Sequence, residues 1–193
     1  MKVTYSWEDG PELLRVTEIE EEKINEVYKE FTSLLPFFKN PERTGSAVNE
    51  DGDFEKENNG LFLLEAYTPI GINASPTHKL FSELAEIGKN ISVTPHSIVN
   101  YFKSFNRLSY LFSAYKNGQY YKAHRDSSSL TGLLWLSEKN YEGGDLLFPD
   151  FNTTITPEKN TLIVFPSHYL HEVTTVKTQS EDYVRFCVSA FFV

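Results

Sequence analysis

The chain has 193 residues, of which 40% are hydrophobic and 15% aromatic, a composition far from that of disordered proteins and sufficient for a substantial core. Its net charge of −9 and the lack of a basic stripe argue against binding to nucleic acid or to an anionic membrane surface. A single cysteine, Cys187, excludes an intramolecular disulfide framework and a cysteine-based zinc site.

The sequence shows neither a signal peptide at its start nor an apolar run of about 18 residues, the length that a membrane span needs. We therefore expect a soluble, intracellular protein in the cytoplasm. No internal repeat or low-complexity linker divides the sequence, so we expect one domain over residues 1–193. Within it, residues 1–95 should supply helical support and residues 96–193 a β-rich core with the functional site.

The N-terminal half is expected to begin with a short edge strand over residues 2–7 and to continue with a helix over residues 19–35. In that helix the apolar residues recur at helical spacing, and glutamates fill the other face. Pro36 should end it. A second helix should start at Ser75, a capping residue followed by proline, and end at Gly88.

Between these helices, residues 40–60 are polar and aperiodic, which indicates a loop or a weak hairpin and a candidate mobile lid. Residues 61–67 form a compact apolar segment that we expect to be a strand. Residues 1–60 carry 7 lysines and arginines against 15 aspartates and glutamates, a net charge of −8. Such a run favours a solvated surface, and a basic partner is the alternative.

After Pro95 the sequence changes to short segments rich in valine, isoleucine, phenylalanine, tyrosine and threonine, divided by turn residues. Eight such segments at this spacing favour a sandwich or barrel over a parallel α/β sheet. The predicted strands are residues 98–102, 108–116, 120–125, 130–136, 145–148, 162–165, 171–176 and 183–193.

Two of these segments carry a metal-binding pattern. His124 and Asp126 are two positions apart on a predicted strand, so their side chains point to the same face. His171, at the start of a later strand, would complete a set of two imidazoles and one carboxylate. This set holds non-haem Fe(II) and leaves other coordination positions open. Because the histidines must be neutral, iron binding should weaken as the pH falls through the imidazole range.

The other histidines fit the pattern less well. His168 is a rival for the ligand role of His171, but the strand that follows His-Glu-Val favours His171. We therefore place His168 in a loop near the site. His78 and His96 lie outside the motifs and are expected to be surface or capping residues.

A longer ordered series of residues resembles the 2-oxoglutarate/Fe(II)-dependent dioxygenase superfamily, and within it the prolyl 4-hydroxylase-like branch. The resemblance covers about residues 100–193, roughly half of the chain. The series consists of Tyr115, Gly118, Tyr121, His124, Asp126, residues 134–136, 142–146 and 148–149, Pro157, residues 165–167 and 171–173, and Arg185.

The resemblance implies a mainly β protein with flanking helices: a double-stranded β-helix, or jelly-roll barrel, with the N-terminal helices packed on one face. It implies Fe(II), 2-oxoglutarate as cosubstrate and O2, with ascorbate as a candidate reductant. Tyr115 would place its hydroxyl against the distal carboxylate of 2-oxoglutarate, and Thr131 and Trp135 would line the cosubstrate pocket. Tyr121 and Ser189 would lie in the pocket or behind its ligands, as would His168.

Arg185 would bind the same distal carboxylate. It is the charged residue of a phenylalanine- and valine-rich strand and shares one face with Cys187 and Ser189, so it should point inward. A buried guanidinium needs an anion, and its fork suits a carboxylate. Arg185 lies 14 residues after His171, a longer interval than this branch usually shows, and a polar turn over residues 178–182 would absorb the difference. Lys177 is the rival basic residue.

The activity implied is hydroxylation of an unactivated C–H bond, with release of succinate and CO2. The leading substrate is a prolyl residue of a peptide or protein; the acidic surface favours a basic or proline-containing peptide. A free amino acid or another small molecule is the alternative within the same chemistry. A non-catalytic jelly-roll binding module is the alternative from another class, and the net charge disfavours nucleic-acid dealkylation.

Overall fold

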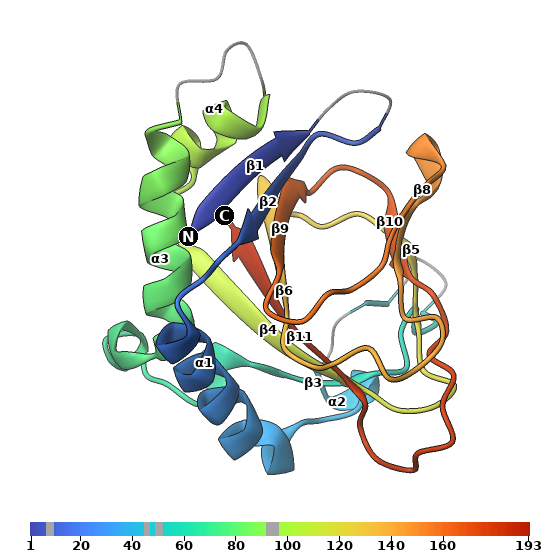
Figure 1. The fold of residues 1–193 in the computed structure, drawn as a ribbon. Helices are drawn as coiled ribbons and strands as arrows, with labels where there is room; N and C mark the ends of the chain where they lie inside the picture. Colours follow the sequence, from blue (N-terminus) through green and yellow to red (C-terminus); the bar gives the residue numbers. More distant parts are fainter. Residues whose placement is uncertain (7–9, 45–46, 49–51, 92–96) are drawn as a thin grey trace.

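The computed structural model describes the chain except for residues 7–9, 45–46, 49–51 and 92–96. Two antiparallel sheets lie opposite each other (Figure 1). The larger sheet has the order β1 (Lys2–Ser6), β2 (Leu13–Thr17), β9 (Leu162–Pro166), β6 (Leu130–Trp135), β11 (Arg185–Phe192), β4 (Leu108–Tyr115), β3 (Asn59–Phe62). The smaller has the order β5 (Tyr121–His124), β10 (His171–Val173), β7 (Leu146–Phe148), β8 (Thr153–Ile155). The predicted mainly β fold with flanking helices is confirmed.

Side chains along β4 and β11 point alternately into the core under the helices and into the interior of the barrel. The two strands pair from Arg185 opposite Tyr115 to Phe192 opposite Leu108. Because successive side chains point to opposite faces, one face of each strand is apolar and packs under the helices, and the other lines a cavity. The cavity face carries Ser109, Leu111, Ser113 and Tyr115 from β4, and Arg185, Cys187, Ser189 and Phe191 from β11.

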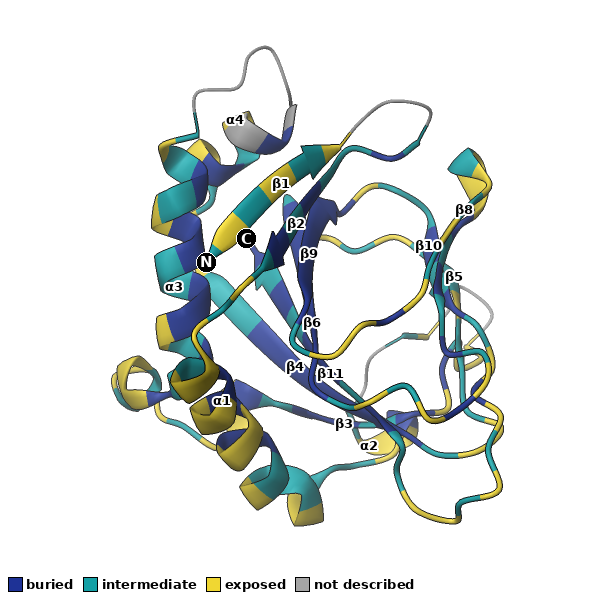
Figure 2. Cartoon of the chain, viewed as in Figure 1, coloured by how far each residue is buried: buried dark blue, intermediate teal, exposed yellow. Residues whose placement is uncertain are grey.

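Three helices cover the outer face of the larger sheet: α1 (Glu21–Leu34), α3 (Pro76–Lys89) and α4 (Ser97–Ser104). Figure 2 shows their buried stripes turned toward the sheet and their exposed faces turned outward. Phe31 of α1 stacks on Phe112 of β4, with ring centroids 5.0 Å apart. Burying each such phenylalanine contributes about 1.5–3 kcal/mol, so these helices stabilise the wall that carries the cavity.

The helix ends follow the local signals. Pro36 lies in a 3-10 turn directly after α1, and the Ser75 hydroxyl accepts a hydrogen bond from the His78 amide at the start of α3 (3.2 Å). Both predicted ends are therefore confirmed. The buried Glu30 joins the two helices, because its carboxylate accepts hydrogen bonds from the Tyr67 hydroxyl (2.6 Å) and from the Thr77 amide (3.1 Å).

Some predicted elements were wrong. Residues 98–102 were expected to form a strand but belong to α4, where Ile98 and Phe102 lie one helical turn apart and are both buried. Their composition favours strands, and packing against α3 and β11 overrides that preference. Residues 61–67 form a strand only as far as Phe62 and continue as a 3-10 turn. The short strands β2 and β8 were not predicted.

Residues 1–95 contribute β1, β2 and β3 to the larger sheet as well as helices. Part of the predicted lid over residues 40–60, together with Trp7 and His96, lies outside the described residues. In the described part, Lys56 forms a β-bridge with Tyr121. The remaining short elements are α2 (Pro41–Thr44) and the 3-10 turns η1 (Leu35–Phe37), η2 (Leu63–Glu65), η3 (Gly71–Ala74) and η4 (Pro149–Phe151). Within the described part of the chain, no helix has the length and hydropathy of a membrane span.

The contact between α3 and α4 can be tested at Gly88. A Cβ atom at this position would lie 2.5 Å from Cγ of the buried Phe102 ring. We expect Gly88→Ala to destabilise the protein by about 1–3 kcal/mol, because the ring has to shift in a packed core. Thermal unfolding measures this, with Glu86→Ala on the exposed face of α3 as the matched control. Equal melting temperatures for wild type and Gly88→Ala would contradict the packing.

Candidate metal centre

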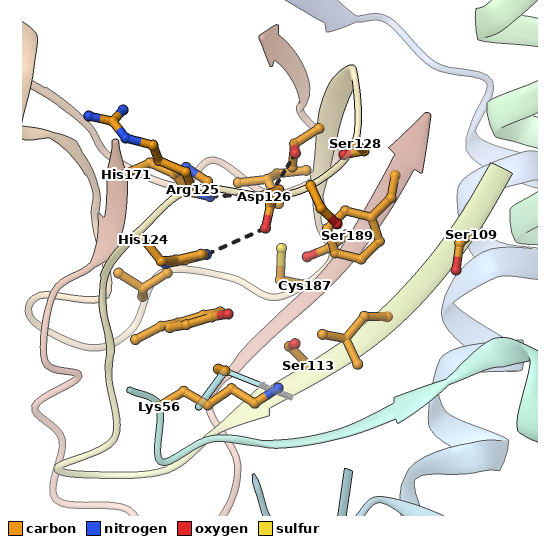
Figure 3. A pocket seen from close by; sticks show the side chains of 18 of the residues that line it. Lys56, Ser109, Ser113, His124, Arg125, Asp126, Ser128, His171, Cys187 and Ser189 are labelled. Atoms are coloured by element: carbon orange, nitrogen blue, oxygen red, sulfur yellow. Dashed lines mark hydrogen bonds and ion pairs between the residues drawn. The ribbon is translucent and has the colours of Figure 1, made fainter. Parts of the chain in front are cut away.

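The structure brings His124, Asp126 and His171 together, as the sequence pattern predicts. In the pairing of β5 with β10, His124 lies directly opposite His171. The Asp126 carboxylate lies 3.6 Å from Nε2 of His124 and 3.5 Å from Nε2 of His171 (Figure 3). One ligand atom from each residue lies within 4.8 Å of the others. A single ion about 2 Å from each ligand atom fits this spacing.

Backbone carbonyls orient both imidazoles. Nδ1 of His124 lies 2.8 Å from the Lys122 carbonyl oxygen, and Nδ1 of His171 lies 2.9 Å from that of Tyr169. A carbonyl only accepts hydrogen bonds, so each Nδ1 carries the proton and donates it. Nε2 of each ring then has its lone pair directed at the site, which is the tautomer that a metal ligand requires.

The charge states also suit a metal. Burial, together with the neighbouring His171, lowers the pKa of His124 to about 4, so its imidazole is neutral at physiological pH. Burial alone would raise the pKa of Asp126, but the neighbouring His171 and His124 and the hydrogen bond from the Thr131 hydroxyl outweigh it and hold that pKa below its usual value. Neutral imidazole and ionised carboxylate are the forms that bind metal ions.

Arg185 lies in the same cavity with only 1% of its surface exposed. Its Nε donates a hydrogen bond to the Gly144 carbonyl (2.8 Å), and its guanidinium carbon lies 4.6 Å from the centroid of the Tyr115 ring. Both terminal nitrogens are buried and have no hydrogen-bond acceptor among the described residues. Such a cation is costly to bury, so two free donors here fit an anion with two oxygens, as in a carboxylate.

The cavity has a volume of about 500 Å³ and joins the three candidate ligands to Arg185. Tyr115, Tyr121, Thr131 and Ser189 line it, as the resemblance implied. Burial raises the pKa of the Tyr115 hydroxyl, which therefore stays protonated and able to donate a hydrogen bond.

Three other residues considered from the sequence, Trp135, His168 and Lys177, do not line the cavity. Trp135 is not among the residues that line the cavity. It lies on the same face of β6 as Thr131, but further along, where apolar side chains fill the interior. The His168 side chain is exposed and does not line the cavity, because its ring packs on Tyr101 and Tyr169 outside it. Lys177, the rival of Arg185, is exposed, and its backbone pairs with Glu142.

Spacing in the sequence did not reveal several contacts of the site. The Thr131 hydroxyl donates a hydrogen bond to Asp126 (2.5 Å) and lies 2.8 Å from the buried Ser167 hydroxyl. Gly144 supplies the carbonyl that holds Arg185. Gly143 and Gly144 both have positive φ, and a Cβ at Gly143 would lie 2.0 Å from the Thr175 carbonyl oxygen. Ser167 and Gly144 come from segments distant from their partners, and the bond between Thr131 and Asp126 spans a turn, so no local pattern indicates these contacts.

Comparisons with known proteins agree with this geometry. Residues 110–193 match the family model of the 2OG-Fe(II) oxygenase superfamily. A search of curated proteins finds no match.

Solved structures with a similar fold include a Pseudomonas putida prolyl-4-hydroxylase, 14% identical, with a TM-score of 0.63 over 93% of this chain and 91% of that chain. They also include the viral collagen prolyl hydroxylase of Paramecium Bursaria Chlorella virus-1, 14% identical, with a TM-score of 0.55 over 93% and 94% of the two chains. A third is IDO from Bacillus thuringiensis, 11% identical, with a TM-score of 0.56 over 94% and 90%. Residues 110–193 therefore resemble the 2OG-Fe(II) oxygenase superfamily, and the chain shares its fold with these solved structures.

Proposed function

We propose that this chain is a dioxygenase that hydroxylates an unactivated C–H bond, with a prolyl residue of a peptide or protein as its leading substrate. The superfamily implies Fe(II), 2-oxoglutarate and O2. The observation that carries the proposal is the buried guanidinium of Arg185, with two free donors, in the same cavity as the His-Asp-His cluster. A metal and a dicarboxylate together would satisfy both ends of this cavity.

In this proposal His124, Asp126 and His171 hold Fe(II). Arg185 binds the distal carboxylate of 2-oxoglutarate with its two terminal nitrogens, and the Tyr115 hydroxyl donates to the same group. When bound, Fe(II), 2-oxoglutarate and O2 supply the oxidising chemistry, which releases succinate and CO2. The chain's own residues bind and orient these groups and exclude water from them. Ascorbate as a reductant stays a prediction.

Behind the metal ligands, three hydroxyl groups position Asp126. Ser128 bonds Ser167 (2.8 Å), Ser167 bonds Thr131 (2.8 Å), and Thr131 donates to the carboxylate oxygen that faces His171. Ser167 is fully buried. Because a carboxylate held by hydrogen bonds loses less freedom when it binds a metal, we assign Thr131 and Ser167 as positioning residues.

Support for a prolyl substrate comes from the fold shared with a prolyl-4-hydroxylase and a collagen prolyl hydroxylase. A free amino acid or another small molecule is the alternative substrate within the same chemistry. A binding module without catalysis fits less well, because the metal-ligand set and the candidate carboxylate-binding arginine are both present in one cavity.

The test is production of succinate coupled to hydroxylation. We expect purified enzyme with Fe(II) and 2-oxoglutarate to form succinate faster with proline-containing peptides than with matched peptides in which alanine replaces proline. Mass spectrometry should find the proline-containing product heavier by one oxygen atom. Hydroxylation of the alanine peptides at the same rate would contradict the prolyl substrate. Substrate-independent turnover alone would leave the dioxygenase chemistry standing and reject peptides.

The positioning residues can be tested by metal affinity. We expect Thr131→Val to weaken Mn(II) binding by about 10- to 100-fold, since it removes the donor to Asp126, and Ser167→Ala to weaken it less. An EPR titration of free Mn(II) gives both constants. Ser127→Ala, an exposed neighbour of Asp126, is the matched control. Unchanged affinity in Thr131→Val would show that the hydroxyl does not position the carboxylate.

A further inference from the structure

The position of the Arg185 guanidinium depends on one backbone carbonyl. The Gly144 carbonyl accepts the hydrogen bond from Nε (2.8 Å), and the guanidinium carbon lies 4.6 Å from the centroid of the Tyr115 ring. Because a guanidinium is planar, a bond at Nε and a ring beside its carbon restrict where the two terminal nitrogens point. The fork that Arg185 presents to the cavity is therefore set by the backbone at Gly144.

Gly143 and Gly144 form a tight corner that leaves room for this arginine. Both have positive φ, +63° and +64°, a conformation that residues with a side chain rarely adopt. A Cβ atom on Gly144 would lie 3.0 Å from Cδ of Arg185. One on Gly143 would lie 2.0 Å from the Thr175 carbonyl oxygen. The corner is thus in close contact with Arg185 on one side and with the segment that follows β10 on the other.

An ion pair closes the loop that carries this corner. Nζ of Lys139 lies 3.1 Å from the Asp145 carboxylate and also donates a hydrogen bond to the Gly143 carbonyl. The two charged side chains are only 24% and 22% exposed, so solvent screens them less than an open surface pair. From the other side, the Thr174 hydroxyl accepts a hydrogen bond from the Asp145 amide (3.0 Å), and the Thr174 carbonyl accepts one from the Gly144 amide (3.1 Å). The corner is held from both sides.

Lys139 and Asp145 lie outside the cavity. Neither is among the described residues that line it, whereas Arg185 and the three candidate metal ligands are. The ion pair can therefore influence a molecule in the cavity only through the corner and Arg185. A change at Lys139 should alter what Arg185 binds and leave the metal ligands unaffected.

We propose that the Lys139–Asp145 pair and the Gly143-Gly144 corner position Arg185, and that this makes the cosubstrate site selective for the length of the 2-oxo acid. The inference rests on the proposed function and deepens it. In that function the 2-oxo acid joins the metal to Arg185, so its chain length has to match their separation. A loosely held arginine could follow a longer acid on its flexible stem, whereas an arginine held at Nε cannot.

The test compares 2-oxoglutarate with 2-oxoadipate, which is longer by one methylene. Isothermal titration calorimetry measures the binding of each acid to the Mn(II)-loaded protein without O2. Wild type should bind 2-oxoglutarate at least about tenfold more tightly, since one methylene too many in a fitted site costs about this much. The affinity for Mn(II) itself is measured by EPR in the same preparations.

Substitutions then test the positioning role. In Lys139→Met the preference for 2-oxoglutarate should fall to within about threefold, with unchanged affinity for Mn(II). Lys139→Arg keeps the cation and should retain most of the preference. Asp145→Asn removes the other half of the ion pair and should lower the preference in the same direction. Lys159→Met is the charge-matched control, because Lys159 pairs with Glu138, the neighbour of Lys139 in the chain, and leaves the corner intact.

Each outcome decides the proposal. An unchanged preference in folded Lys139→Met or Asp145→Asn would overturn it, as would equal binding of the two acids by wild type. A parallel loss of Mn(II) affinity in these variants would show a general structural role of the loop and would also overturn it. Melting temperatures identify the folded variants, and Asp145→Asn decides where Lys139→Met does not fold. Failure of Mn(II)-loaded wild type to bind either acid would instead reject the proposed function itself.

Discussion

The pairing of β5 with β10 is the constraint on which the site depends. Its register sets His124 directly opposite His171, and Asp126 follows within reach of both rings. A shift of this register by one residue would turn one imidazole to the other face of the sheet and remove the ligand set. The larger sheet performs the complementary task, because the β4–β11 ladder carries Tyr115 and Arg185 side by side at one end of the cavity.

The cavity contains both the metal-ligand set and a buried cation, Arg185, and the two need different electrostatic surroundings. The metal ligands need neutral imidazoles and an ionised carboxylate: burial lowers the pKa of His124, and the groups around Asp126 hold the pKa of its carboxyl below the usual value. Arg185 is a buried cation in the same cavity, and its two terminal nitrogens have no hydrogen-bond acceptor among the described residues. An uncompensated buried cation destabilises the fold, so such a cavity gains most from anionic ligands. In the proposed function, the distal carboxylate of 2-oxoglutarate offsets the charge of Arg185, which links cosubstrate binding to stability.

The sequence predicted the ligand triad, the inward direction of Arg185 and the two long helices, because each leaves a local pattern: alternation on a strand, helical spacing, or a cap. Prediction from the sequence failed where contacts between segments far apart in the chain determine the local structure. Residues 98–102 have strand composition but lie in a helix that packs against α3, and Phe102 of this helix contacts Phe192 of β11. The sequence places Lys56 in a polar loop, whereas the structure pairs it with Tyr121 beside the cavity. Thr131 was placed in the pocket, but its bonds to Asp126 and Ser167 depend on tertiary structure.

The proposed binding of Fe(II) and 2-oxoglutarate in this cavity is tested most directly by anaerobic titration of the protein with both ligands. The weak visible absorption band of the chelate is followed. Wild type should develop the band at a stoichiometry of one iron per chain. His171→Ala should lose it at every 2-oxoglutarate concentration, and Arg185→Gln should recover it only at cosubstrate concentrations higher by about 100-fold. No band in folded wild type supplied with both ligands would contradict the account and leave a jelly-roll binding protein as the better explanation.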